Sequence, residues 1–452
     1  MAKAPYPCGD SGSLGARRRL RPAVAGALAA VATLAVAAPT LAVGGVAGGT
    51  ARPVGAVYVA SNAFSGNEIL TFPRYADGSL GPVEPGVPTG GLGSGPGLLL
   101  TDDPLGSQSS LLVDQDRRLL FVVNAGSNDV SVLSLRGNRL SLVDREPSDG
   151  AYPVSLALFD HTLYVINAAG NSLAGFSVGD DGHLTHLQTC ALPSLPSGAD
   201  PVIPGTQTQS SQPVIVQTGG QVGFSPDGTR LLVVSKEGPR LQTGFPFSTT
   251  LGPGRVDVYD VGGGPHTLLN CGHPTSTVLA SNASGNGKMP FSFGWTAQGD
   301  LLLLEVFGAT TSFAGGAVSS YELRHDDTLT PISTSVPSGE TAPCWIVRRG
   351  PNIYVANNVP NFFTPPNAIS HYVVHGNGQL DPTPSVAATL APDLTDMAIT
   401  ANGRFLYQLA TGSAQVWPYS IGSDGALAGL TPVTDGEPPQ SGQVGIATYD
   451  FH

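Results

Sequence analysis

The sequence predicts an all-β fold, a seven-bladed β-propeller with four-stranded blades, whose ring is closed by the C-terminal strand completing blade one. A pair of strand patterns recurs seven times along the chain, which is the mark of a repeat architecture. A tight hairpin follows each pair, most often of the Asp-Gly or Asn-Gly type, as expected between antiparallel strands. One surplus strand, residues 443–447, remains at the C-terminus, whereas the first pair has no strand before it.

The recurring pair is an apolar strand followed by a strand of alternating polarity, and we assign these to the second and third strands of each blade. The seven pairs are 57–60 with 68–72, 119–124 with 130–135, 163–167 with 173–178, 231–235 with 256–261, 301–305 with 318–323, 353–357 with 369–374 and 405–410 with 416–421. The hairpins after them include Asp77-Gly78, Asp181-Gly182, Asn377-Gly378 and Asp424-Gly425. Asp, Asn and Gly tolerate the positive φ that such turns need, so each hairpin predicts a fourth, outer strand.

The two chain ends supply the argument for a closed ring. Residues 443–447 nearly copy residues 221–225, the predicted first strand of the fourth blade. We therefore expect the C-terminal strand to pair with residues 57–60 and complete the first blade. Closure removes the exposed sheet edges that an open array of blades would leave.

The composition agrees with turn-rich β structure. Gly and Pro account for 59 and 39 of the 452 residues, while hydrophobic residues make up 41% and charged residues 12% of the chain. A chain of this kind has enough apolar side chains to bury a core, which a disordered chain does not.

The N-terminus has the pattern of an export signal. Four arginines between residues 17 and 21 precede an apolar run over residues 24–38, and small residues at Ala35, Ala37 and Ala42 offer cleavage sites. An uncleaved membrane anchor is the other reading, but the run is short for a bilayer span. We expect a signal peptide over residues 1–42, a flexible segment over 43–56, a propeller over 57–452, and a secreted or extracytoplasmic protein.

The charge of the exported chain is strongly negative. Residues 1–42 hold five of the 21 Lys and Arg residues and one of the 33 Asp and Glu residues, which leaves 16 basic against 32 acidic residues. A surface of this sign repels nucleic-acid phosphates and anionic lipids. We therefore expect no nucleic-acid partner and, once the signal is removed, no membrane partner.

Three cysteines remain after signal removal, Cys190, Cys271 and Cys344. Cys190 and Cys271 follow outer strands of neighbouring blades, so a disulfide between them is compatible with the fold, and an odd third cysteine leaves at least one thiol outside it. The chain has no Cys-x-x-Cys motif and no Cys/His cluster, so we expect no zinc site and no cofactor.

Loop lengths identify the face of the propeller that should carry the site. The long connections are residues 84–110, 190–220, 236–254, 308–316 and 358–367, and all of them emerge on the same face in a four-stranded blade. Long loops on a rigid scaffold usually carry function. Several of these loops contain aromatic residues that would rim the channel mouth, namely Phe245, Phe247, Phe313, Phe362 and Phe363.

Glu305 is the strongest candidate for a catalytic group. It follows four consecutive leucines, and a carboxylate at the end of an apolar strand is costly unless it is paired or functional. Glu305, or Glu237, could act as general base, while Lys236, Lys288 or Arg240 could stabilise an oxyanion. The competing interpretation of Glu305 is a strand-end residue that faces solvent or forms a structural ion pair.

The remaining candidates lie at strand ends that point toward the channel mouth. The predicted substrate-binding residues are Asn124, Asn167, Ser292, Asn357 and Trp345. Asparagine at a strand end also shapes turns through its own hydrogen bonds, which is the competing interpretation for the three asparagines. An oxygen-rich calcium site would need six to eight ligands, and no Asp-rich loop supports one, so we expect no metal.

Several strings in the chain resemble a known family. They are Phe224-Ser225-Pro226-Asp227-Gly228, Thr89-Gly90-Gly91-Leu92-Gly93, Pro290-Phe291-Ser292-Phe293-Gly294, Glu305-Val306-Phe307-Gly308 and Cys344-Trp345. With the closing strand, they make the chain similar to the seven-bladed lactonase-like propellers, which include 6-phosphogluconolactonase and fungal carboxymuconate-lactonizing enzyme, and most similar to the secreted bacterial members. The resemblance covers residues 57–452 and implies a small lactone or carbohydrate-derived ligand. We expect a monomer.

The chain departs from the catalytic members of that family at one motif. Those members resemble one another in a Pro-Arg-His string that opens an inner strand, whereas the matching string here is Pro290-Phe291-Ser292. Cycloisomerase chemistry is therefore less expected than hydrolysis, and hydrolysis of a phosphorylated gluconolactone is unsupported. Two functions stay open: a secreted hydrolase of a small lactone or sugar-acid ester, and a non-catalytic propeller that binds a small molecule, glycan or protein through its long-loop face.

Overall fold

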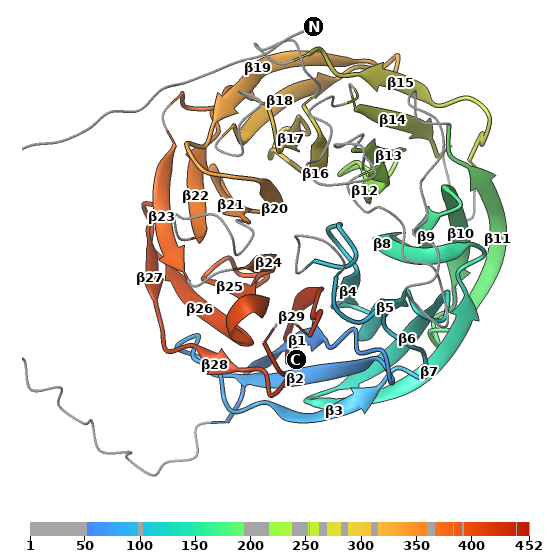
Figure 1. Cartoon of the computed structure of the whole chain (residues 1–452), viewed down its shortest axis with the longest axis vertical. Coiled ribbons are helices and arrows are strands. Elements are labelled where there is room, and N and C mark those ends of the chain that lie inside the picture. Colours follow the sequence, from blue (N-terminus) through green and yellow to red (C-terminus); the bar gives the residue numbers. More distant parts are fainter. Residues whose placement is uncertain are drawn as a thin grey trace, which may run out of the picture. The chain divides into compact units, whose positions relative to one another are not determined.

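The computed structural model confirms a seven-bladed propeller. It describes residues 52–97, 103–193, 217–236, 252, 254–261, 269–281, 288–308, 315–358, 367–382, 384–390, 393–439 and 441–451. In this part of the chain seven antiparallel sheets surround one axis (Figure 1). Six sheets have four strands, and the seventh has five because its outer strand is split in two. The strands follow sequence order from the axis outward, except that the first sheet begins with the C-terminal strand.

The innermost strands line the channel and the second strands lie directly outside them. The innermost strands of blades one to seven are β29 (Ile446–Asp450), β4 (Leu111–Asp114), β8 (Ala151–Phe159), β12 (Gly219–Phe224), β16 (Pro290–Trp295), β20 (Pro343–Arg349) and β24 (Leu394–Ile399). The second strands are β1 (Gly55–Ala60), β5 (Leu119–Asn124), β9 (Thr162–Ala169), β13 (Arg230–Ser235), β17 (Leu301–Glu305), β21 (Asn352–Asn357) and β25 (Phe405–Ala410).

The third and fourth strands complete each blade, and all seven predicted pairs of second and third strands are present. The third strands are β2 (Glu68–Arg74), β6 (Asp129–Arg136), β10 (Ser172–Val178), β14 (Arg255–Asp260), β18 (Ala317–Leu323), β22 (Asn367–Val373) and β26 (Gln415–Ile421). The outer strands are β3 (Glu84–Pro88), β7 (Arg139–Pro147), β11 (Leu184–Ala191), β15 (Thr275–Val278), β19 (Leu329–Pro337), β23 (Ser385–Leu390) and the split pair β27 (Leu427–Gly429) and β28 (Val433–Thr434). A 3₁₀ turn, η2 (Thr411–Ser413), joins β25 to β26.

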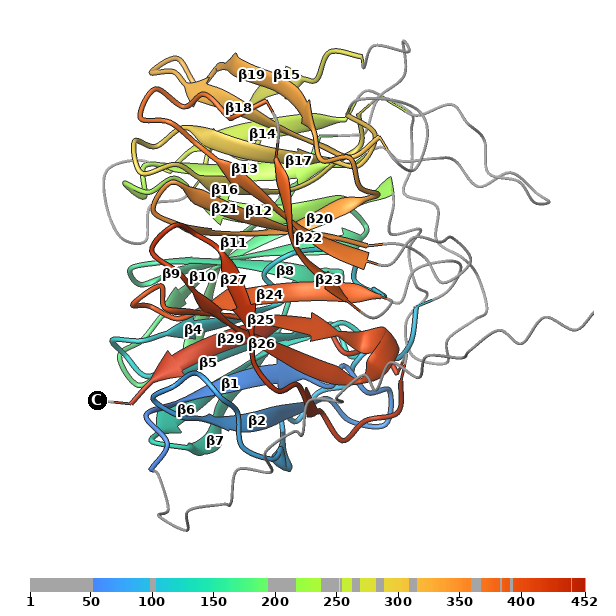
Figure 2. The same cartoon turned by 90° about the vertical axis from the view of Figure 1, so that its left-hand side faces the viewer.

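The hairpins have the backbone that their residues predict. Gly78, Gly182, Gly378 and Gly425 all adopt positive φ, between 78° and 88°. These turns and the turns between first and second strands emerge on one face of the propeller, which we call the short-turn face. In the side view of Figure 2 this face is the left edge, where β29 also ends.

The C-terminal strand closes the ring as predicted. β29 pairs antiparallel with β1 from Gly55↔Asp450 to Val59↔Ile446, and the Arg74 guanidinium forms an ion pair with Asp450. The boundaries differ from the prediction by a few residues. β1 begins at Gly55, inside the segment expected to be flexible, and β29 begins at Ile446, because Gly445 turns the chain with a φ of 87°.

The core is a series of apolar layers between neighbouring blades. The layer between blades seven and one joins Val57 and Phe72 to Phe405 and Tyr407, all at most 3% exposed. Packing sheet faces against each other in this way buries both faces of every blade. In the described residues no helix has the length and the apolar character that crossing a bilayer requires.

A disulfide joins Cys190 to Cys271 across 81 residues of sequence, as the sequence allowed. It ties β11 of blade three to the segment before β15 of blade four. Cys344 is the free cysteine of the described part and is buried. Disulfides persist mainly in oxidising compartments.

Candidate functional site in the central channel

The innermost strands share an unusual backbone where they enter the channel. Six of the seven have a residue with positive φ within two positions of their first residue, and these residues are Ser109, Tyr152, Met289, Ala342, Asp393 and Gly445. In β8, β12, β16, β20 and β24 the register against the second strand also shifts at this end. Strained backbone and β-bulges often redirect side chains at functional sites.

Residues 103–110, which we call the channel segment, cross the channel rather than run over its rim. The Gln108 side chain donates to the Ile346 carbonyl at 2.9 Å and accepts from the Ile346 amide at 3.1 Å. The Trp345 indole donates to the Ser107 carbonyl at 3.0 Å. The segment, which leads from blade one into blade two, therefore contacts blade six across the ring.

The same segment is held by blades three and four. The Ser155 hydroxyl donates to the Gln108 carbonyl at 2.8 Å, and the Ser107 hydroxyl donates to the Val154 carbonyl at 2.6 Å. The Lys236 ammonium donates to the carbonyls of Gly106 and Gly219, the latter at 3.0 Å. In Figure 1 the chain before β4 accordingly reaches toward the centre of the ring.

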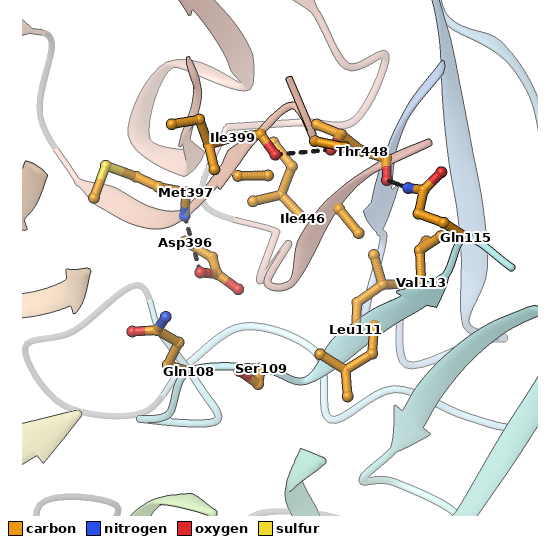
Figure 3. Close-up of a pocket in the computed structure, with 14 residues that line it drawn as sticks. Gln108, Ser109, Leu111, Val113, Gln115, Asp396, Met397, Ile399, Ile446 and Thr448 are labelled. Atoms are coloured by element: carbon orange, nitrogen blue, oxygen red, sulfur yellow. Dashed lines mark hydrogen bonds between the residues drawn. The ribbon is translucent and has the colours of Figure 1, made fainter. Parts of the chain in front are cut away.

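A cavity of about 290 Å³ lies beside the channel segment, between the innermost strands of blades seven, one and two (Figure 3). Its described lining consists of Gln108, Ser109, Leu111, Leu112, Val113, Gln115, Asp396, Met397, Ala398, Ile399, Ala401, Ile446, Ala447 and Thr448. Most of these side chains are apolar, and Asp396 is the only one that ionises. In Figure 3 its carboxyl group points toward the amide of Gln108.

Asp396 is buried, with 4% of its surface exposed. Its Oδ1 atom accepts a hydrogen bond from the Met397 amide at 2.9 Å, and the carboxyl also interacts with the Ile446 backbone. Burial raises the pKa of this carboxyl to about 8, and the negative charge of Asp103 adds to the shift. The group is therefore mainly protonated at neutral pH, and it loses its proton at a pH only slightly above neutrality. A pKa close to the working pH suits a general base.

Asp103 and Lys236 form a second charged group next to the cavity. Asp103 is 2% exposed, and its Oδ1 atom accepts from the amides of Leu105 and Gly106 at 3.1 and 2.9 Å. Burial raises its pKa to about 6, although the Lys236 charge opposes the shift. Lys236 is fully buried and its Nζ atom lies 5.1 Å from the centre of the Phe291 ring, so this predicted cation fixes the channel segment.

Glu305 is fully buried, and its partner Lys288 is 2% exposed. Glu305 does not line the cavity. Its Oε1 atom accepts from the hydroxyl of Ser319 at 2.7 Å and pairs with the Lys288 ammonium at 3.4 Å. Its Oε2 atom accepts from the hydroxyl of Ser335 at 2.6 Å. The carboxylate thus lies within blade five, between β17, β18 and β19, in the arrangement expected of a structural ion pair.

The predicted asparagines lie at or near the ends of second strands, the position that Glu305 occupies in blade five. Asn124 and Asn357 end their second strands and donate to serines on the third strands, Ser131 at 2.8 Å and Ser370 at 2.9 Å. Glu305 accepts from Ser319 in the equivalent way. Asn167 donates to the Ser148 carbonyl at 2.9 Å, and all four side chains are fully buried. This polar position recurs because it joins the strands of a blade.

The remaining predicted residues divide into buried and undescribed ones. The Ser292 hydroxyl donates to the Cys344 carbonyl at 2.5 Å, and Trp345, 1% exposed, packs edge-on against Phe291. Glu237, Arg240 and the aromatic residues predicted at the channel mouth lie outside the described residues. In the described ranges no three His, Cys, Asp or Glu side chains come together in a way that could hold a metal ion.

Replacing Glu305 by glutamine is expected to lower the free energy of unfolding by about 3 kcal/mol, because Lys288 would keep a buried charge without its counter-ion. Denaturant unfolding of the purified protein measures this loss. Glu322→Gln is the matched control, since Glu322 lies on the adjacent β18 in an exposed pair with Arg324, where the expected change is below about 0.5 kcal/mol. Equal stability of Glu305→Gln and wild type would contradict the structural role.

Sequence reasoning missed Asp396, Asp103 and Gln108. Asp396 carried a usable signal, because it is the one charged residue of the otherwise uncharged strand β24, which is the argument that selected Glu305. The channel segment carried no comparable signal. Its position depends on contacts with residues as far as 238 positions away in the sequence.

Solved structures with the same architecture include proteins named as lactonases. A putative 6-phosphogluconolactonase from Bacteroides fragilis matches with a TM-score of 0.58 and 17% identity, over 88% of this chain and 98% of that one. A periplasmic gluconolactonase from Pseudomonas aeruginosa matches with a TM-score of 0.59 and 17% identity, over 87% and 99%. No family model and no curated protein matches the chain. The chain therefore has the fold of the 6-phosphogluconolactonase-like seven-bladed propellers.

Proposed function

We propose that this protein is an exported hydrolase of a small, uncharged lactone, and that Asp396 is its general base. The observation that carries the proposal is a buried carboxyl with a pKa of about 8 in a channel cavity of about 290 Å³. Buried ionisable groups with shifted pKa values in concave sites are the usual candidates for catalysis. The lactonase names of proteins with this fold agree with the reaction class.

The reaction needs one proton to move twice. The Asp396 carboxylate takes a proton from a water molecule while the water oxygen bonds to the lactone carbonyl carbon. The bond from that carbon to the ring oxygen then breaks, and the ring oxygen receives the proton from Asp396, which leaves a hydroxy acid. Gln108 lines the cavity beside Asp396, and one N–H of its amide is bonded to the Ile346 carbonyl, so its second N–H would supply a hydrogen bond to the substrate.

The lining favours an uncharged substrate. None of the described lining residues is Lys or Arg, so the cavity offers no cation to a phosphate group, and an ionised Asp396 would repel one. The volume lies at the lower limit for ligand pockets, which suits a single sugar-sized ring. This reasoning separates the proposed substrate from the phosphorylated lactone in the name of the Bacteroides fragilis protein.

The extracytoplasmic location is part of the proposal. Its support is the N-terminal pattern over residues 1–42 and the Cys190–Cys271 disulfide, which an oxidising compartment would preserve. A monomer with a small-molecule ligand remains our expectation for the assembly.

A non-catalytic binding protein is the second candidate, and one observation favours it. Lys236 and Lys288, the described cations proposed to stabilise an oxyanion, are both buried and engaged by the channel segment and by Glu305. A mostly apolar cavity without a cation is also a suitable binding site for an uncharged ligand.

A panel of γ- and δ-lactones, with and without a phosphate group, separates the two candidates. We expect hydrolysis of unphosphorylated lactones, followed by acid release after subtraction of the spontaneous rate, to be at least about tenfold faster than hydrolysis of the phosphorylated compound. Because only the ionised carboxyl acts as a base, kcat should rise with pH and level off above about 8. Calorimetric binding without any hydrolysis would support the binding protein instead.

A further inference from the structure

Beyond the reaction itself, and resting on the proposed function, we infer that the cavity is single-ended: its ligand enters from the short-turn face, and Ala401 limits the size of the ligand. The long-loop face, where sequence reasoning placed the site, lies on the other side of the channel segment.

The lining residues give the direction of the cavity. On blade seven they run from Asp396 through Ile399 to Ala401, the first exposed residue of the turn after β24. On blade two they run from Gln108 to Gln115, just beyond the end of β4. Both series lead from the middle of the channel to the short-turn face, so the mouth of the cavity lies there.

The channel segment closes the inner end of the cavity. Asp103, Leu105 and Ser107 are each at most 3% exposed, and the segment bonds to the inner strands of blades three, four and six, as described above. Gln108 and Ser109 at its C-terminal end are themselves part of the cavity wall. A ligand beside Asp396 is therefore separated from the long-loop face by backbone that is hydrogen-bonded on several sides.

The mouth is held by a fixed set of hydrogen bonds. The Gln115 amide donates to the Thr448 carbonyl at 2.8 Å, and its oxygen accepts from the Asp450 amide at 3.1 Å. The Thr448 hydroxyl donates to the Ile399 carbonyl at 3.0 Å. These bonds join β4, β29 and β24 at the mouth, so its width is set by side chains such as the methyl group of Ala401 and not by a moving lid.

Thiol labelling tests this inference without any lactone. Val113 is half-buried and lines the cavity, so Val113→Cys places a reactive thiol inside it. We expect methyl methanethiosulfonate to label this thiol, and a second substitution, Ala401→Trp, to slow the labelling at least about tenfold. The native thiol of Cys344 is buried and its pKa is raised well above the ordinary value. A chain without residues 1–42, which hold Cys8, and with Val113 intact therefore serves as the unlabelled background.

Ala297→Trp is the matched control for Ala401→Trp. Ala297 is the exposed residue at the same place in blade five, in the turn Thr296-Ala297-Gln298-Gly299 that repeats Thr400-Ala401-Asn402-Gly403. Both turns are closed by an amide-to-carbonyl bond from the glycine to the threonine, but Ala297 does not line the cavity. We expect labelling within about twofold of the Val113→Cys rate.

Two results would overturn the inference: unchanged labelling in the Ala401→Trp variant, or equal slowing by both tryptophans. If labelling depends on Ala401 but the protein hydrolyses no lactone, the proposed cavity mouth is supported and only the proposed reaction is rejected. In an active protein, Ala401→Trp should raise KM for larger lactones more than for smaller ones, with a smaller effect on kcat. The labelling and the lactone assay therefore fail independently.

Discussion

Asp396→Asn is expected to lower kcat for lactone hydrolysis by about 10²- to 10⁴-fold, which is the usual contribution of a general base. Asparagine keeps the size of the side chain and can still accept the hydrogen bond from the Met397 amide, but it cannot take a proton from water. Because the native carboxyl is mainly protonated at neutral pH, the amide also resembles its resting state. The variant should therefore fold normally while losing turnover, as measured by circular dichroism and by acid release.

The same variant should change the pH dependence of stability in a defined direction. Folding raises the pKa of Asp396 from 3.8 to about 8, so the folded protein binds this proton more tightly than the unfolded chain. The stabilisation is complete below about pH 4 and is lost as the pH rises toward 8. Wild type should therefore lose stability relative to Asp396→Asn across this range, and the difference should become constant above it.

Glu305→Gln provides the control for this experiment, because it removes a buried carboxylate outside the cavity. We expect Glu305→Gln to lower stability and retain kcat. We expect Asp396→Asn to retain the fold and lower kcat. Wild-type kcat in Asp396→Asn would remove this residue from the mechanism. A loss of kcat in Glu305→Gln with normal unfolding would return the catalytic role to the carboxylate that the sequence suggested.

The ring could be predicted because its determinants are local and repeated. Apolar strands and Asp-Gly hairpins recur in every blade, and the surplus C-terminal strand leaves one place to pair. The boundaries were less predictable, as the closing strand shows. Residues 443–447 nearly copy residues 221–225, of which 221–224 lie in β12 of blade four, yet here Gly445 adopts positive φ and the strand begins at Ile446. The shared Gln-Val-Gly string therefore lies in a strand in blade four and before the strand in blade one.

The site could be predicted only in part, since burial alone does not tell a structural carboxylate from a functional one. Glu305 and Asp396 carry the same sequence signal, an acidic residue in an apolar strand. What distinguishes them is the neighbouring strand: Ser319 and Ser335 bind Glu305 within its blade, whereas Asp396 faces a cavity. That difference arises from the position of the strand in the blade and from the channel segment, and neither can be read from a single strand.

A chain that ends at Gly445 is expected to lose the native propeller at 37 °C. It would lack β29, whose Ile446 and Tyr449 are 4% and 2% exposed, and each such side chain stabilises the fold by about 1.5–3 kcal/mol. Arg74 would keep a buried charge without Asp450, and β1 would become an exposed edge. Together these losses match the whole stability of a typical domain, so we expect aggregation and no cooperative thermal transition.

Circular permutation provides the positive control for this truncation. Asp450 is paired with Gly55, and the Phe451 amide donates to the Val54 carbonyl at 2.9 Å. A short Asp-Gly turn between residues 451 and 54 would therefore convert β29 and β1 into an ordinary hairpin. New termini between Asn402 and Gly403 would make β24 the closing strand in place of β29. If closure acts through strand pairing, the permuted chain should unfold cooperatively near the wild-type temperature; failure of both chains would instead show that the native termini are themselves required.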